Sequence, residues 1–280
     1  QMLIETQPAT FSDLIRISGL SHGTDVWTNN AQQLVQEGKA IISTVISTRD
    51  DIMTYLINQG LDKELSFTIM ESVRKGKGLR DEWEAQMRKF DVPDWYIWSC
   101  KQIKYMFPKA HAAAYVMMAY RIAYFKVFYP LEYYTAFFSI RASNFDYGLM
   151  CKGKSVLDAH IQDYKNRFNE LTKKEKDMIK DMRIVQEMYA RGYEFLPIDI
   201  YQVDAKRFRI IDGKIMPSLS SINGMGEKAA EGVVAGREGG EFLSLEDFRL
   251  RTKTGKSLIE LLKSEEILKG LPETNQMSLF

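Results

Sequence analysis

The chain has 280 residues, of which 45% are hydrophobic and 12% are aromatic. This composition supplies enough apolar surface for about two packed domains and excludes a disordered tail. The formal net charge is only +1, so binding of a polyanion would have to rely on local basic patches. No segment approaches the ~20 consecutive apolar residues that span a bilayer, and the first residues lack the pattern of a signal peptide, so we expect no membrane association.

The two cysteines, Cys100 and Cys151, are far apart and show neither CxxC nor Cys/His spacing. This pattern argues against a structural zinc site and against a disulfide scaffold. We therefore expect a reducing, cytoplasmic compartment.

The N-terminal region is predicted to be a compact array of short helices. Apolar spacing predicts a helix over residues 10–17, with Thr10 or Ser12 as its N-cap. Gly19 and Gly23 then predict a turn. That turn contains Ser18, Ser21 and His22. Further helices are expected over residues 29–36, 41–59, 62–73 and 82–89, with another element beginning at Pro93.

The most informative stretch is residues 101–130, KQIKYMFPKAHAAAYVMMAYRIAYFKVFYP, in which a cationic segment precedes an apolar helix. Pro108 restricts the residue before it, so the helix is predicted to begin near Lys109 and to end before Pro130. The unpaired amide groups and the macrodipole at a helix N-terminus favour anions.

Basic residues around this helix start could contact a phosphate directly: Lys101, Lys104, Lys109 and His111. Tyr105 offers a flat ring on which a base could stack. The alternative is an ordinary buried helix with solvated lysines at one end. The spacing of the residues does not decide between these two interpretations.

The C-terminal half changes from aromatic to charged sequence. Residues 131–142 continue the aromatic pattern, and Asn, Asp and Gly residues between 143 and 153 suggest a boundary. An amphipathic helix with a lysine-rich outer face follows. Its apolar positions are Met178, Met182, Val185 and Tyr189. After Gly192, β-branched alternation around Asp212 and Gly213 predicts a two-stranded hairpin.

Residues 222–230, INGMGEKAA, match a helix-hairpin-helix element. Glycine reaches positive φ, so Gly224 and Gly226 would let backbone amides approach a DNA phosphate, and Lys228 could add charge. Such binding would be indifferent to base sequence. Many tight turns between helices also need glycine, so the alternative is a purely structural turn.

Residues 254–256, TGK, resemble a second, degenerate hairpin of the same kind. The GKS at residues 255–257 is not a phosphate loop, because Leu250 stands where the upstream glycine is required.

Several segments resemble the C-family replicative DNA polymerases. The sequence FPKAHAAAYVMMAYRIAYFKVFYPLEYYTAFFSIRA at residues 107–142 is similar to the fingers region of that family. ISGLSHGTDVW at residues 17–27 and RDDIMTYLI at residues 49–57 resemble its PolC-type branch, and VRKGKGL at residues 73–79 and the final NQMSLF fit the same family. The resemblance implies the C-terminal part of a much larger polymerase, with palm, exonuclease and PHP regions expected before residue 1.

The resemblance implies roles for individual residues in binding the incoming deoxynucleoside triphosphate (dNTP). Arg49 is expected on the triphosphate, because a guanidinium presents forked donors to phosphate oxygens. Tyr105 is expected to pack against the nascent base pair. The surrounding pocket would include Lys109, His111, Ser18, Gly19 and His22. The alternative is that Arg49 pairs with Asp50 or Asp51 on a helix surface and that His22 caps a turn.

We assign no catalytic or metal-binding residue to the chain. Asp50 and Asp51 are adjacent, but neighbouring helical residues point about 100° apart, and no third acidic residue has a suitable spacing. The resemblance implies that Mg²⁺ is bound mainly by palm aspartates outside this segment. The chain is therefore expected to bind a nucleotide without transferring one by itself.

The last residues resemble the short peptide by which replication proteins engage the sliding clamp. The residues of that motif are Gln276, Leu279 and Phe280. Such peptides bind modestly, and tethering to a ring around DNA raises their effective concentration.

Together these observations predict a mainly α-helical protein with a helical fingers domain, followed by a helical clamp- or duplex-binding region with a small β-hairpin and a helix-hairpin-helix element. The expected regions are residues 1–142 (nucleotide binding), 143–196 (helical linker near duplex or clamp), 197–271 (hairpin and helix-hairpin-helix) and 272–280 (clamp-binding tail). The expected function is part of a DNA-directed DNA polymerase, a nucleotidyltransferase of the cytoplasm and nucleoid. Its partners would be primer-template DNA, dNTP, the sliding clamp and other replisome subunits. The alternative is a non-catalytic DNA-binding adaptor that recruits the clamp.

Overall fold

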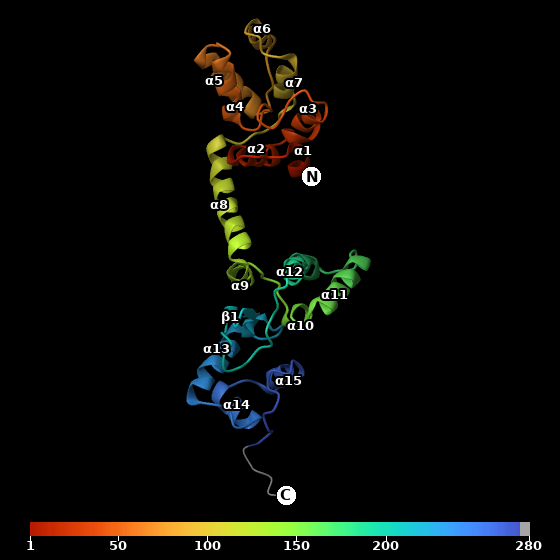
Figure 1. Ribbon diagram of the computed structural model, residues 1–280, viewed down its shortest axis with the longest axis vertical. Helices are drawn as coiled ribbons and strands as arrows, with labels where there is room; N and C mark the ends of the chain where they lie inside the picture. Colours follow the sequence, from red (N-terminus) through yellow and green to blue (C-terminus); the bar gives the residue numbers. More distant parts are fainter. Residues whose placement is uncertain (275–280) are drawn as a thin grey trace. The chain divides into compact units, whose positions relative to one another are not determined.

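The computed structural model describes residues 1–274, and within that range it is mainly helical with a two-stranded antiparallel sheet (Figure 1). The predicted fold class is confirmed. The chain forms two compact units, residues 1–123 and residues from 124 onward. This boundary lies inside helix α8 (Lys109–Phe128) rather than at residues 143–153. The reason is that Tyr134 and Phe138 of α9 (Pro130–Ile140) pack into the core of the second unit.

The first unit consists of short helices joined by tight turns. It contains α1 (Met2–Thr6), α2 (Phe11–His22), the kinked π-helical turn η1 (Trp27–Ala31), α3 (Gln32–Gln36), α4 (Arg49–Asn58), α5 (Lys63–Arg74), α6 (Asp81–Lys89), α7 (Asp94–Gln102) and the first part of α8. Helices α4 and α5 lie side by side (Figure 1). The helices predicted over residues 62–73 and 82–89 and after Pro93 are confirmed.

The turn predicted at Gly19 is wrong. Helix α2 continues through Gly19, so Ser18, Ser21 and His22 lie on a helix. The predicted cap at Thr10 is confirmed, because its side chain accepts from the N–H of Asp13 while the Asp13 carboxylate accepts from the N–H of Thr10. A glycine inside a helix is tolerated where another backbone approaches it closely, and Gly19 meets this condition, as described below.

The helix predicted over residues 41–59 is too long at its start. Helix α4 begins only at Arg49, and Thr48 before it is extended. The carboxylate of Asp51 accepts hydrogen bonds from the N–H groups of Ser47 and Thr48 at 3.1 and 2.9 Å. These bonds hold the preceding chain in the extended conformation of a helix cap. The helix expected over residues 29–36 is likewise interrupted, because Asn29 has a positive φ and α3 starts at Gln32.

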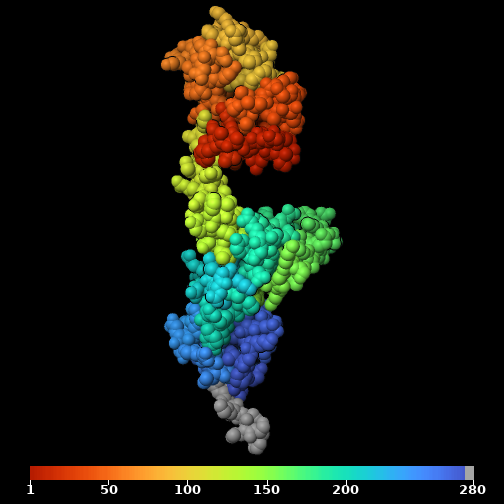
Figure 2. Space-filling view, viewed as in Figure 1, coloured from red at the N-terminus to blue at the C-terminus, as the bar shows by residue number. Residues whose placement is uncertain are grey.

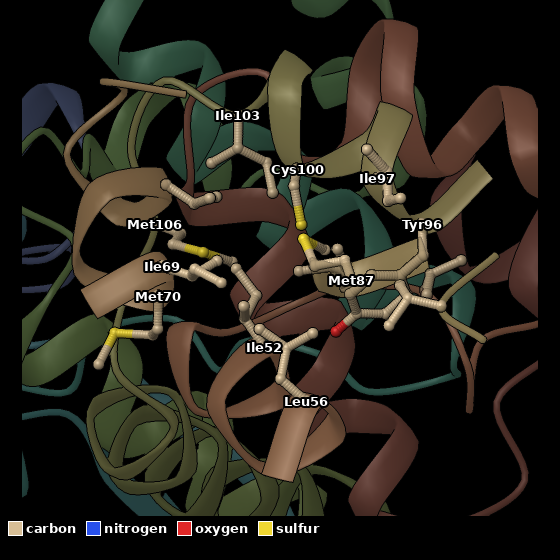
Figure 3. Close-up of a cluster of buried hydrophobic side chains, with 14 of the residues drawn as sticks. Ile52, Leu56, Ile69, Met70, Met87, Tyr96, Ile97, Cys100, Ile103 and Met106 are labelled. Atoms are coloured by element: carbon tan, nitrogen blue, oxygen red, sulfur yellow. The ribbon is translucent and has the colours of Figure 1, made fainter. Parts of the chain in front are cut away.

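Apolar side chains from several helices form the core of the first unit, part of which is drawn in Figure 3. Ile52 of α4, Ile69 of α5, Met87 of α6 and Tyr96 of α7 point toward one another and are buried. Cys100 lies in the same cluster, and burial raises the pKa of its thiol. This cysteine therefore packs as a small apolar side chain and is not a reactive thiolate.

The second unit contains the remainder of the described chain. Its elements are the end of α8, α9, α10 (Tyr147–Met150), α11 (Lys154–Asn166), α12 (Lys173–Ala190), β1 (Arg209–Ile211), β2 (Lys214–Met216), η2 (Leu219–Ser221), α13 (Glu227–Gly236), η3 (Arg237–Gly239), α14 (Leu245–Thr252) and α15 (Lys256–Ser264). Helix α12 is the predicted amphipathic helix, and it buries Met178, Met182 and Val185. The predicted hairpin is confirmed: Ile210 faces Ile215, and Asp212 and Gly213 of the turn both have positive φ.

Helix α8 is apolar on all sides, yet much of it is exposed. Tyr115, Met118 and Ile122 are 61%, 55% and 53% exposed, and this stretch is yellow-green in Figure 2. A helix that is hydrophobic all round is normally buried. No helix among residues 1–274 is long and apolar enough to cross a membrane.

Candidate functional site

Three segments of the first unit meet around the start of α8. The N–H of Thr24, just after α2, donates to the carbonyl of Tyr105 at 2.8 Å. The N–H of Arg49, at the start of α4, donates to the carbonyl of Phe107 at 3.1 Å. These backbone bonds bring the end of α2 and the start of α4 beside residues 105–111. Most of the predicted nucleotide-binding residues lie on these segments.

The N-terminus of α8 already has an anion. The Oδ2 atom of Asp50 accepts a hydrogen bond from the N–H of Lys109 at 2.6 Å. A carboxylate at this position satisfies one of the unpaired amide groups and complements the helix dipole. The expectation that the helix start itself favours an external phosphate is therefore weakened, and the cationic side chains around it become the better candidates.

The lysines near α8 differ in their partners. Lys101 forms an ion pair with Glu84 of α6, with 2.7 Å between Nζ and Oε1, and this differs from the expected contact with a phosphate. Lys104 and Lys109 are exposed and form no ion pair with any residue of the range 1–274. These two ammonium groups are therefore available to an anionic ligand.

Arg49 is held in place without using its hydrogen-bond donors. Its guanidinium lies 3.7 Å from the carboxylate of Glu71 and 4.0 Å from that of Asp50. Both distances exceed the range of an N–H to oxygen hydrogen bond, and the side chain is 36% exposed. Arg49 and Asp50, which the alternative prediction pairs, are therefore in long contact only. Within residues 1–274 the side-chain donors of Arg49 are unused.

Glu71 of α5 is a member of the site that no sequence motif marked. Arg74 donates to it through two nitrogens, each at 2.8 Å, and Lys75 Nζ lies 3.0 Å away. The hydrogen bonds from Arg74 and Lys75 lower the pKa of Glu71 to about 2. The one sequence signal for this cluster is the spacing of Arg74 and Lys75 three and four residues after Glu71, which places the three side chains on one side of the helix.

Aromatic rings line the path from Tyr105 to α8. Tyr105 is 43% exposed and packs edge-on to Phe107 with 5.3 Å between ring centroids. Phe107 stacks on His111 at 4.8 Å, and His111 contacts Tyr115 at 4.6 Å. The exposed ring of Tyr105 is thereby held by a row of neighbours. Phe107 was not predicted as a site residue, although it lies within the motif FPKAHA.

Ser18 and His22 lie one turn apart on α2 and line a groove beside α8. His22 Nδ1 is 2.8 Å from the carbonyl of Ser18, and because a carbonyl only accepts, Nδ1 carries the proton and Nε2 is an acceptor in the neutral ring. The groove has a volume of about 430 Å³ and a mainly apolar lining that includes Ile17, Tyr115 and Tyr120. This places the predicted pair against α8, beside the Phe107 ring that His22 meets edge-on at 6.0 Å.

Gly19 is buried and does not line the groove. A Cβ atom at this position would lie 2.5 Å from the carbonyl oxygen of Ser47 and 2.8 Å from Cγ2 of Thr48. The glycine therefore lets α2 pack directly against the backbone that precedes Arg49. Gly19 therefore affects the site by allowing α4 to lie close to α2. This differs from its predicted role as part of the pocket wall.

The carboxylates of this region have protein partners. Asp51 accepts from the backbone of Ser47 and Thr48, and Asp50 accepts from Lys109. Within the described residues, no group of three or more His, Cys, Asp or Glu side chains could hold a metal ion. These residues do not fit a Mg²⁺ site.

The second unit contains the predicted helix-hairpin-helix turn. Gly224 has a φ of 93°, and Gly226 is the extended N-cap of α13. A Cβ at Gly226 would meet nothing within 4 Å, and Lys228 is exposed. Lys206 neutralises Glu227 on the first turn of α13 at 2.8 Å. The surface at Gly226 is therefore unobstructed by neighbouring atoms and carries little opposing charge.

The predicted second hairpin repeats this geometry. Lys253 has a φ of 55°, and Gly255 is the extended N-cap of α15, with a ψ of 160° that compares with 151° at Gly226. A Cβ at Gly255 would also meet nothing within 4 Å. Lys253 and Lys256 are exposed. The two turns thus have the same order of a positive-φ residue, one further residue, and a glycine at the N-cap.

The predicted tail residues Gln276, Leu279 and Phe280 lie outside the described residues.

Two family models match separate parts of the chain. Residues 1–91 match the bacterial DNA polymerase III alpha subunit finger domain, and residues 192–277 match a helix-hairpin-helix motif. The first match contains Ser18, His22 and Arg49, and the second contains both glycine turns.

Curated relatives match the chain over its whole length. The DNA polymerase III PolC-type proteins of Caldanaerobacter subterraneus subsp. tengcongensis, Clostridium perfringens and Bacillus subtilis are 52%, 52% and 51% identical over 280 residues. Each alignment covers 100% of this chain and 19% to 20% of the relative. The predicted resemblance is confirmed, and the chain spans about one fifth of the length of these relatives.

Proposed function

Because the chain is related over its whole length to DNA polymerases III of the PolC type, we propose that it is the fingers and DNA-binding segment of a replicative DNA polymerase. In this role the first unit positions the incoming dNTP and the second unit holds primer-template duplex. The observation that carries the proposal is the state of Arg49. Its guanidinium is oriented and exposed, with its donors unused within residues 1–274.

Triphosphate binding follows from the charges around α8. A guanidinium binds phosphate oxygens through paired donors, and the exposed ammonium groups of Lys104 and Lys109 add attraction. The carboxylate of Asp50 repels a phosphate from the start of α8, where it already accepts from the N–H of Lys109. The triphosphate is therefore assigned to Arg49, and the exposed ring of Tyr105 is assigned to the nascent base pair.

Duplex binding is assigned to the two glycine turns of the second unit. A Cβ at Gly226 or at Gly255 would meet nothing within 4 Å, so a phosphate can approach the backbone there without obstruction by a side chain. Lys228, Lys253 and Lys256 would release counterions from the duplex. Contacts of this kind carry no base information, which suits an enzyme that copies any sequence.

Several parts of the proposed enzyme lie outside the described residues. Mg²⁺ would be held by palm aspartates elsewhere in the polypeptide and would activate the primer hydroxyl and neutralise the triphosphate. The tail with Gln276, Leu279 and Phe280 would engage the sliding clamp. Other replisome subunits would bind in the cytoplasm at the nucleoid, where the chromosome is copied.

Substitution of Arg49 tests the nucleotide role. In the full-length polymerase, Arg49→Ala should raise the KM for dNTP about ten- to a hundredfold, because a charge-assisted hydrogen bond to phosphate is lost. The Kd for primer-template DNA should stay unchanged. The control is Arg80→Ala, since Arg80 is also exposed, forms an ion pair with Glu82 at 3.5 Å and lies over the ring of Trp83 at 4.7 Å. Equal losses in nucleotide and DNA binding would contradict the assignment.

The rival function is a non-catalytic adaptor that binds DNA through its glycine turns. Both functions predict that the 280-residue chain binds DNA and fails to extend a primer. They differ in the full-length protein, which extends a primer only if it is a polymerase. A full-length protein that binds DNA and the clamp without dNTP incorporation would replace the enzyme proposal with the adaptor.

A further inference from the structure

Glu71 is surrounded by three cations from two helices. Arg74 donates to its carboxylate at 2.8 Å through both Nε and Nη2, Lys75 Nζ lies 3.0 Å away, and Arg49 Nη1 lies 3.7 Å away. Its side chain is 21% exposed. With a pKa of about 2, maintained first by the hydrogen bond from Arg74, it is ionised throughout the neutral range.

The two arginines of this cluster are used differently. Arg74 donates two hydrogen bonds to Glu71, and only 22% of its side chain is exposed. Arg49 makes no side-chain hydrogen bond within residues 1–274 and is 36% exposed. Arg74 thus fixes the carboxylate of Glu71 by hydrogen bonds. The same carboxylate attracts the guanidinium of Arg49 but leaves its hydrogen-bond donors unused.

The backbone of Arg49 is independently fixed. Its N–H donates to the carbonyl of Phe107, and the backbone that precedes it packs closely against Gly19 at Ser47. Only the long side chain retains freedom. Asp50, its other acidic neighbour at 4.0 Å, is already engaged with the N–H of Lys109. Glu71 is therefore the nearer of the two charges that restrict the guanidinium.

We propose that Glu71 is a positioning residue for the incoming nucleotide, restricting the guanidinium of Arg49 so that the triphosphate meets an ordered donor. The inference rests on the proposed function and names a residue that acts through Arg49. An arginine that is already ordered loses less side-chain freedom when it binds a ligand. Removing the restraint should weaken nucleotide binding about two- to tenfold, the range expected for one rotamer-rich side chain.

The direction in which the KM for dNTP changes distinguishes a positioning role of Glu71 from a purely electrostatic one. Glu71→Gln keeps the shape of the side chain but removes a negative charge close to the binding site. By charge alone, the variant would attract a triphosphate more strongly, and the KM for dNTP would fall. A positioning role predicts the opposite, a rise in KM with little change in kcat.

The test is steady-state primer extension by the full-length polymerase with four variants: Glu71→Gln, Arg49→Ala, the double variant and Glu84→Gln. Glu84 is the matched control, because it is a buried carboxylate of the same unit that also pairs with two cations, Arg88 and Lys101. We expect E71Q to raise KM two- to tenfold, about the range given above, and E84Q to leave it unchanged. In the R49A background, E71Q should have no further effect, because its action passes through Arg49.

The outcomes distinguish the two proposals. If R49A leaves KM unchanged, the nucleotide role of Arg49 fails, and this inference fails with it. If R49A raises KM but E71Q lowers it or leaves it unchanged, only the positioning role is overturned. The same holds if E71Q still raises KM in the R49A background. Should E71Q prove unstable, Glu71→Asp retains the charge with a carboxylate set back by one methylene, and an unchanged KM for that variant would also count against positioning.

Discussion

Gly19→Ala should destabilise the first unit, because the added methyl group has no room. Its Cβ would lie 2.5 Å from the carbonyl oxygen of Ser47 and 2.8 Å from Cγ2 of Thr48. The first of these atoms belongs to the backbone and cannot rotate away. Overpacking of this kind costs about 1–3 kcal/mol, whereas glycine to alanine inside a helix gains about 1 kcal/mol. We therefore expect a net loss of about 1 kcal/mol, and at most about 2 kcal/mol.

Tryptophan fluorescence during urea unfolding measures this loss in the correct unit. All four tryptophans, Trp27, Trp83, Trp95 and Trp98, belong to residues 1–123. Their signal therefore reports the first unit without a contribution from the second. The change in the urea midpoint, multiplied by the slope of the unfolding curve, gives the loss in free energy of unfolding.

Ser21→Ala provides the matched control, because it introduces the same residue on the same helix at an exposed position. It should leave stability unchanged or raise it slightly, since alanine has the higher helix propensity. A G19A variant as stable as S21A would refute the reasoning, because the contact between α2 and Ser47 would then not be tight. Under the proposed function, G19A should also raise the KM for dNTP in the full-length protein, since the clash displaces the backbone that leads into Arg49.

Two further predictions concern the charge cluster and the glycine turns. The folded-state pKa of Glu71 is about 2 against an ordinary value of 4.5, so its ion pairs stabilise the fold above about pH 4.5 and this contribution is lost as the pH falls toward 2. Urea unfolding should show wild type about 1 kcal/mol more stable than E71Q at pH 7, after allowance for solvent screening, and the gap should close near pH 2. A gap that persisted at low pH would contradict this linkage. Gly224→Ala places a residue with a Cβ at a φ of 93°, which is strained. Fluorescence anisotropy should then show that the variant binds duplexes of unrelated sequence more weakly, and by the same factor for each. Weaker binding to one sequence only would indicate that the protein reads bases.

Local sequence signals predicted those features of the fold that depend on local energetics. The cap at Thr10, the hairpin turn at Asp212 and Gly213, and the start of α8 after Pro108 each follow from the conformational limits of one or two residues. The apolar spacing of α12 predicted its buried face in the same way.

The errors arose where tertiary contacts override local preference. Gly19 was predicted to break α2, but a glycine is also the residue that permits close approach of another backbone, and here Ser47 supplies that backbone. Residues 41–48 have apolar spacing suited to a helix, yet Asp51 binds the backbone of Ser47 and Thr48 and delays the helix to Arg49. The role of Glu71 could not be predicted, because its distance to Arg49 depends on the packing of α5 against α4.

The adjacent acids Asp50 and Asp51 show how one dipeptide can cap two helices. Residue 51 points back along its own helix and caps α4, whereas residue 50 points to a different side and caps α8. Because adjacent helical side chains diverge by about 100°, these two neighbours can serve two different helix starts. Exchange of Asp50 for asparagine would keep an acceptor but remove the charge, so the N-terminus of α8 would again favour an external anion. With Asp50 in place, the proposed function assigns the phosphate to the unused donors of Arg49 instead.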